Sequence, residues 1–124
     1  MPILVIGLSH HTAPVTLRER FAFAEKQIPE TLQRLRAMRI AEEGVILSTC
    51  NRVEIYAATD HESRPAFHAL QQFLLDCHDY RGPIGNEIYA LVEPQSIEHL
   101  FKVACGLDSM VLGETEILGQ LKKA

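Results

Sequence analysis

The sequence predicts an α+β fold in which helices cover one face of an antiparallel, four-stranded sheet. Short β-branched runs alternate with longer segments whose apolar residues recur at helical spacing, in the order strand, helix, strand, strand, helix, strand. The two middle runs are separated only by Ser48–Arg52, a spacing that predicts a hairpin. This is the ferredoxin-like βαββαβ order, and additional C-terminal helices follow it.

The first strand and the first two helices lie before Gly44. Ile3–Leu8 is a nearly continuous apolar run and predicts a buried strand that ends in a polar loop. Pro14 suits the first turn of a short helix that extends through Phe21. A second, amphipathic helix begins at Lys26 and ends before Gly44.

The second half of the chain continues the pattern. Val45–Leu47 and Val53–Ala58 are the paired strands, Pro65–Cys77 is the second covering helix, and Ile88–Val92 is the fourth strand. Pro94 marks the start of another helix.

Two amphipathic segments follow the fourth strand. In the first, the apolar stripe comprises Ile97, Leu100, Phe101 and Ala104, and Gly106 is the predicted stop. The second begins near Glu114 and still continues at Ala124 without a stop signal. We therefore expect residues 1–124 to be a single domain and a fragment of a longer parent protein.

Composition limits the possible classes of protein. With 124 residues, of which 47% are hydrophobic and 23% charged, the chain resembles an ordinary globular domain. Its apolar runs are too short for a membrane helix, and no signal peptide is recognisable, so we expect a cytoplasmic protein. Six basic and three acidic side chains between Thr16 and Arg39 indicate either a phosphate-facing surface or a solvated helix face.

The three cysteines differ in their predicted environments. Cys50 lies at the hairpin tip, two residues from Arg52, whose charge favours the thiolate form, so it is either a nucleophile or a bystander thiol in a tight turn. Cys77 and Cys105 lie on or beside apolar helix stripes, and we expect them to be packed. Since no C-x-x-C pair or helical histidine pair occurs, we expect no structural metal.

His99 does not belong to the apolar stripe of its helix. At helical spacing it lies roughly 150° from the centre of that stripe. It is therefore either a solvated surface histidine or a general acid–base group that faces a cleft or another domain.

The glycine-bracketed segment Gly106–Gln120 lacks the glycine fingerprints of nucleotide-binding loops. Glu114 and Glu116 lie near the start of the last predicted helix. They either cap that helix or bind a substrate ammonium group.

Three segments together resemble one known family. Gly7–Phe21 (GLSHHTAPVTLRERF), Leu47–Tyr56 (LSTCNRVEIY) and Gly106–Ala124 (GLDSMVLGETEILGQLKKA) closely resemble the N-terminal catalytic domain of glutamyl-tRNA reductase. The resemblance implies that a cysteine thiolate attacks the ester of glutamyl-tRNA. NADPH then reduces the enzyme-bound thioester to glutamate-1-semialdehyde, a precursor in tetrapyrrole (porphyrin, haem) biosynthesis.

By motif position, the resemblance also implies site residues. Cys50 is the nucleophile and His99 a histidine important for activity. The implied substrate-binding residues are Thr49, Asn51, Arg52, Ser109, Glu114, Thr115, Glu116 and Gln120. A guanidinium such as that of Arg52 matches the glutamyl side-chain carboxylate in a two-bond grip.

The same resemblance implies cofactors and partners outside this chain. NADPH is bound by a domain that the chain does not include, and no metal is expected. The parent is a homodimer through a helical region, and it passes its product to glutamate-1-semialdehyde aminomutase. A ferredoxin-like domain can also be a non-catalytic regulatory or partner-binding module, for which Cys50 would show ordinary thiol reactivity.

Overall fold

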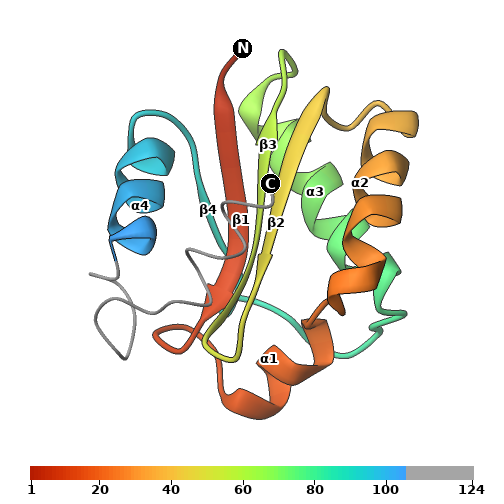
Figure 1. Ribbon diagram of the computed structural model, residues 1–124, viewed down its shortest axis with the longest axis vertical. Helices are drawn as coiled ribbons and strands as arrows, with labels where there is room; N and C mark the ends of the chain where they lie inside the picture. The colour runs from red at the N-terminus through yellow and green to blue at the C-terminus, as the bar shows by residue number, and fades with distance from the viewer. Residues whose placement is uncertain (106–124) are drawn as a thin grey trace.

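The computed structural model describes residues 1–105, and it confirms the predicted α+β fold. The sheet is antiparallel with the strand order β2-β3-β1-β4 (Figure 1). The elements are β1 (Ile3–Ser9), α1 (Val15–Phe21), the 3-10 turn η1 (Glu25–Gln27), α2 (Ile28–Ala37), β2 (Glu43–Ser48), β3 (Arg52–Ala58), α3 (Ser63–Cys77), β4 (Tyr89–Leu91) and α4 (Gln95–Ala104).

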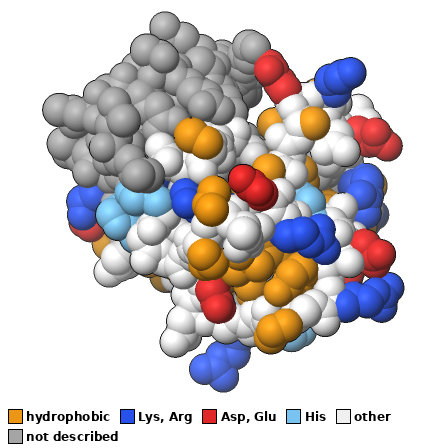
Figure 2. Space-filling view, turned by 90° about the horizontal axis from the view of Figure 1, so that it is seen from below, with side chains coloured by type: hydrophobic (Ala, Val, Ile, Leu, Met, Phe, Trp, Pro, Cys, Tyr) orange, Lys and Arg blue, Asp and Glu red, His pale blue; other side chains and the backbone are white. Residues whose placement is uncertain are grey.

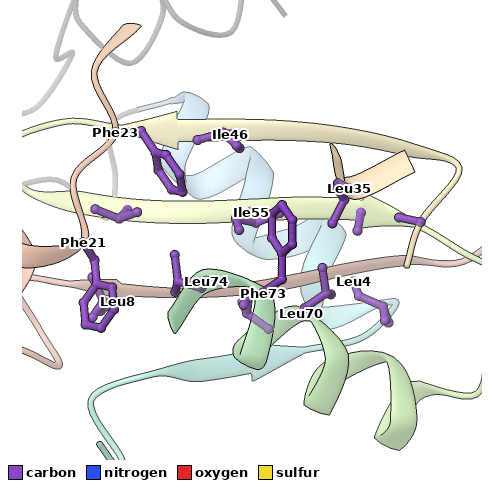
Figure 3. Close-up of a cluster of buried hydrophobic side chains, with 14 of the residues drawn as sticks. Leu4, Leu8, Phe21, Phe23, Leu35, Ile46, Ile55, Leu70, Phe73 and Leu74 are labelled. Carbon is purple, nitrogen blue, oxygen red and sulfur yellow. The ribbon is translucent and has the colours of Figure 1, made fainter. Parts of the chain in front are cut away.

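The main hydrophobic core lies between one face of the sheet and the helices α2 and α3 (Figure 1). Successive side chains of a strand point to opposite faces, so β1 and β3 contribute every second residue to this core. Figure 3 shows aromatic and aliphatic side chains of the strands and helices packed together there. Its labelled members are Leu4, Leu8, Phe21, Phe23, Leu35, Ile46, Ile55, Leu70, Phe73 and Leu74.

The opposite face of the sheet is partly polar, and α4 lies on that side (Figure 1). On β3 the alternate residues Arg52, Glu54 and Tyr56 are buried on it. A small apolar cluster of Leu47 and Val103 accompanies them. The domain therefore uses one sheet face for its hydrophobic core and the other for buried polar side chains.

The inward face of α4 differs from the sequence prediction. Ser96 and Val103 are its buried residues, whereas Phe101, placed on the predicted inward stripe, is 67% exposed. The His99 side chain is only 16% exposed and contacts Glu54, so the alternative of a solvated surface histidine is wrong. The cause is the polar sheet face, because a helix that covers buried polar groups turns polar and small side chains toward them.

Element boundaries shift by a few residues elsewhere. The second helix begins with η1, ends at Ala37, and is followed by Arg39 in a left-handed conformation (φ 59°). The fourth strand is shorter than expected, with three residues. The helix predicted from Glu114 lies outside the described residues. Within residues 1–105, no helix is long and apolar enough to cross a membrane.

Candidate active site

A tight turn at the β2–β3 tip presents Cys50. The backbone N–H of Thr49 donates to the carbonyl of Arg52 at 2.8 Å. The Thr49 hydroxyl oxygen accepts from the backbone N–H groups of Asn51 (3.1 Å) and Arg52 (3.3 Å). Thr49 and Asn51 are buried, whereas Cys50 is exposed. The turn therefore buries the two residues next to Cys50 and leaves the Cys50 thiol accessible. The prediction that Cys50 lies at the tip of a hairpin is confirmed.

Two further segments brace this turn from outside. The backbone N–H of His10, in the loop after β1, donates to the Asn51 carbonyl at 2.9 Å. The Arg18 guanidinium, from α1, donates to the carbonyls of Cys50 (3.2 Å) and Asn51 (3.4 Å). Because a charged donor bridges two consecutive carbonyls, the backbone on which Cys50 sits is restrained on both sides.

A cavity of about 210 Å³ lies beside the thiol. Its lining comprises Arg18, Glu19, Ala22, Phe23, Ser48, Thr49 and Cys50. The Ser48 hydroxyl accepts from the Phe23 backbone N–H at 2.9 Å, which ties the segment after α1 to the hairpin. An exposed thiol at the edge of a preformed hollow is an arrangement that suits a substrate site.

On the polar sheet face, Glu54 is the centre of a buried network. Its carboxylate accepts from the Tyr56 hydroxyl at 2.9 Å and from the Tyr89 hydroxyl. Nε2 of His99 also contacts this carboxylate, and Arg52 Nη1 lies 3.6 Å from Oε2. Arg52 and Glu54 have no exposed side-chain area. Burial and the Glu54 carboxylate raise the pKa of Tyr89, which keeps its phenol protonated as a donor.

A second cavity, of about 400 Å³, opens on the same face as this network. Its lining comprises Ser9, His11, Thr12, Tyr89, Leu91 and His99. Ser9 pairs with Arg52 across the β1–β3 ladder, next to the hairpin turn. The cavity and Cys50 therefore lie toward the same end of the sheet.

Figure 2 shows the molecule from this end. Lys and Arg side chains are interspersed with Asp and Glu around a hydrophobic patch. The described part of this face has no continuous basic stripe of the kind that follows a phosphate backbone. The structure thus gives no added support to the phosphate-facing interpretation of the Thr16–Arg39 charges.

The predicted site residues fall into three groups. Thr49, Cys50 and Asn51 form the turn, while Arg52 and His99 meet at Glu54 on the polar sheet face. No described contact joins Cys50 to His99 within residues 1–105. The remaining predicted residues, Ser109, Glu114, Thr115, Glu116 and Gln120, lie outside the described residues.

Sequence reasoning missed Glu54, Tyr89 and Arg18. A signal for Glu54 was available, because Arg52, Glu54 and Tyr56 alternate with apolar residues and thus share one strand face. Tyr89 and Arg18 gave no such signal, since their contacts depend on strand pairing and loop packing.

The other two cysteines differ from each other. Burial raises the pKa of the half-buried Cys77 thiol, and the nearby Arg34 guanidinium partly opposes this shift. Cys105 is exposed, so the expectation that it is packed is wrong. It is the C-cap residue that follows the last residue of α4. Within residues 1–105, no cluster of three His, Cys, Asp or Glu side chains could hold a metal ion.

Comparison with known proteins agrees with the earlier resemblance. Residues 6–124 match the family model "Glutamyl-tRNAGlu reductase, N-terminal domain". A glutamyl-tRNA reductase of Paenibacillus macerans is 46% identical over 129 aligned residues, covering 100% of this chain and 28% of the relative. The solved glutamyl-tRNA reductase of Methanopyrus kandleri superimposes with a TM-score of 0.74 at 28% identity, covering 98% of this chain and 26% of that one.

The chain thus spans little more than a quarter of the length of these relatives. The family match extends over nearly all of it, and the structural match covers the same sheet and helices. On these grounds the chain belongs to the family of glutamyl-tRNA reductase N-terminal domains.

Proposed function

We propose that this domain takes the glutamyl group from glutamyl-tRNA as a thioester on Cys50. The single observation that carries the proposal is the exposed Cys50 thiol on a braced hairpin tip, beside a preformed cavity, in a chain of this family. A thiolate is a good nucleophile toward an activated ester, and a fixed backbone keeps its sulfur in one place relative to a bound substrate.

The proposed transfer balances as follows. The Cys50 sulfur forms a bond to the glutamyl carbonyl carbon, and the bond from that carbon to the ribose oxygen of the tRNA breaks. The ribose oxygen takes up the proton that the thiol gives up, so that free tRNA leaves and no net charge is created. His99 is our candidate for the group that carries this proton.

The substrate-binding roles are also proposals. We propose that Thr49 and Asn51 shape the turn around the glutamyl group. Arg52 would hold the glutamyl side-chain carboxylate, because a guanidinium fork matches two carboxylate oxygens. This role requires the Arg52 guanidinium, which has no exposed side-chain area and lies 3.6 Å from Glu54, to become accessible when the substrate binds. Ser109, Glu114, Thr115, Glu116 and Gln120 would complete the contacts to the substrate.

We further propose the family's wider context for the parent protein. NADPH would supply the hydride that reduces the thioester to glutamate-1-semialdehyde. The described strand-to-helix junctions offer no glycine-rich phosphate loop, since Pro14 and Pro94 precede α1 and α4. We also propose that the parent protein is a cytoplasmic homodimer. It would pass its product to glutamate-1-semialdehyde aminomutase.

The test is incubation of the 124-residue chain with glutamyl-tRNA, followed by mass spectrometry. We expect one glutamyl adduct on the Cys50 peptide that hydroxylamine removes, and none in Cys50→Ser. Cys105→Ser is the matched control, because Cys105 is also exposed, and it should form the adduct normally. Adducts divided between Cys50 and Cys105, or none on either, would refute the acyl-transfer proposal.

A further inference from the structure

A buried glutamate on β3 holds the candidate proton-transfer residue. Glu54 has no exposed side-chain area, and Nε2 of His99 contacts its Oε2. A second contact to Oε2 comes from the Tyr89 hydroxyl, while Oε1 accepts from Tyr56. The three partners lie on α4, β4 and β3, and between them they contact both carboxylate oxygens of Glu54.

The strand register explains why this arrangement can form. Gly7 on β1 pairs with Glu54 on one side and with Tyr89 on the other. A Cβ at residue 7 would lie 2.8 Å from Glu54 Cγ and 2.5 Å from the Val53 carbonyl oxygen. The missing side chain thus leaves room for Glu54 and Tyr89 to meet above the central strand.

The donors around Glu54 determine which His99 nitrogen carries a proton. Two phenolic hydroxyls and the Arg52 guanidinium at 3.6 Å surround the carboxylate, so it serves as an acceptor. A carboxylate oxygen can accept a hydrogen bond only from a protonated nitrogen, and Nε2 must therefore carry the hydrogen. In the neutral imidazole, Nδ1 then has the lone pair.

The second ring nitrogen is available for a ligand. Within residues 1–105, no hydrogen-bond partner of Nδ1 is described, and His99 lines the cavity of about 400 Å³. A base must have its lone pair directed toward the proton that it accepts. Nδ1 is the His99 nitrogen that can meet this requirement.

We infer that Glu54 is a positioning residue that fixes His99 as its Nε2–H tautomer, so that Nδ1 accepts and returns the proton during acyl transfer to Cys50. The role of Nδ1 in proton transfer rests on the proposed function, because it requires that Cys50 take up the glutamyl group. The tautomer itself does not depend on that function and can be measured on the chain without substrate.

The first measurement is the two-bond ¹H–¹⁵N correlation spectrum of the histidine rings in the 124-residue chain, with His99 assigned from the spectrum of His99→Asn. We expect the Nε2–H pattern in the unmodified chain. In Glu54→Gln we expect an averaged pattern, because the amide keeps the shape of the carboxylate but offers one acceptor atom instead of two. A predominant Nδ1–H form in the unmodified chain would overturn the inference.

The second measurement is the single-turnover rate of glutamyl transfer to Cys50 at saturating glutamyl-tRNA. Glu54→Gln should lower this rate by roughly 10²–10⁴-fold, the range of a general acid–base contribution, with little change in the half-saturating tRNA concentration. Glu54→Asp, which keeps the charge, should recover part of the rate. An unchanged rate in Glu54→Gln would also overturn the inference.

A double-mutant cycle separates positioning from a general structural role. If Glu54 acts through His99, adding Glu54→Gln to His99→Asn should cost less than a further threefold, whereas independent effects would multiply. Ser96→Ala is the matched control on α4, because the Ser96 hydroxyl donates to the Ile3 carbonyl at 2.7 Å and is not a hydrogen-bond partner of Glu54. Its rate should stay within threefold of the unmodified chain.

Failure of the two proposals can be told apart. If the unmodified chain formed no Cys50 adduct, the proposed function would fail, while the spectrum would still show whether Glu54 fixes the tautomer. If the adduct formed but Glu54→Gln and His99→Asn gave multiplicative losses, acyl transfer would stand and the positioning role would be rejected.

Discussion

Replacing Gly7 by alanine tests whether the register of β1 determines the packing of Glu54. The new Cβ would lie 2.5 Å from the Val53 carbonyl oxygen and 2.8 Å from Glu54 Cγ, distances at which atoms must move. The nearer atom belongs to the backbone of a central strand, which cannot move without disturbing the ladder. Overpacking of this kind typically costs about 1–3 kcal/mol. Loss of glycine's freedom in the unfolded chain offsets about 0.4–1 kcal/mol of it.

The middles of these two ranges leave a net loss, so we expect Gly7→Ala to lower the free energy of unfolding by about 1.3 kcal/mol, or roughly 5 °C in melting temperature. Two other glycines provide graded controls. A Cβ at Gly44 would meet the flexible end of Leu35 at 2.8 Å, and one at Gly85 would have an ordinary contact at 3.6 Å. Urea unfolding should rank the losses Gly7, then Gly44, then Gly85. A Gly7→Ala protein as stable as the Gly85→Ala protein would refute the reasoning.

Three further predictions concern the site. Arg18→Lys should slow glutamyl transfer by roughly tenfold, about 1.4 kcal/mol, because the lysine side chain is one bond shorter and its nitrogen does not reach both hairpin carbonyls. An unchanged single-turnover rate would contradict this. His99→Ala should lower the free energy of unfolding in urea by about 1–3 kcal/mol, since it removes a partner of the buried Glu54 carboxylate. A loss below about 0.5 kcal/mol would show that the contact between His99 and Glu54 does not contribute to stability. Cys77 should react with iodoacetamide more slowly than Cys105, because burial raises the pKa of its thiol and less thiolate forms at a given pH. Its reaction rate should therefore rise at a higher pH than that of Cys105. Equal rates for the two cysteines at each pH would contradict the burial of Cys77.

Local patterns in the sequence were sufficient for most of the fold. β1 and β3 lie where apolar runs predict them, and the five-residue spacing at Ser48–Arg52 correctly predicts the hairpin that carries Cys50. These features depend on neighbouring residues, since strand period and turn chemistry act over a few positions. The strand order followed from the order of the elements, because split βαβ units pair in few ways.

The orientation of α4 could not be predicted in the same way. An apolar stripe indicates the buried face of a helix only if the surface that it contacts is also apolar. Here that surface carries Arg52, Glu54 and Tyr56, so α4 turns His99 toward the sheet and leaves Phe101 exposed. The chemical nature of a contact partner distant in the sequence determines this outcome.

Part of the candidate site could likewise be predicted from the sequence, and part could not. By itself, the sequence determined that Cys50 stands at a hairpin tip, because the residues of the turn are consecutive. Only the tertiary structure decided that Glu54, Tyr89 and His99 form one buried network over Gly7. These residues come from β3, β4 and α4, and their meeting depends on a strand register that pairs Gly7 with both neighbours. A shift of one residue in that register would turn each side chain to the other face of the sheet.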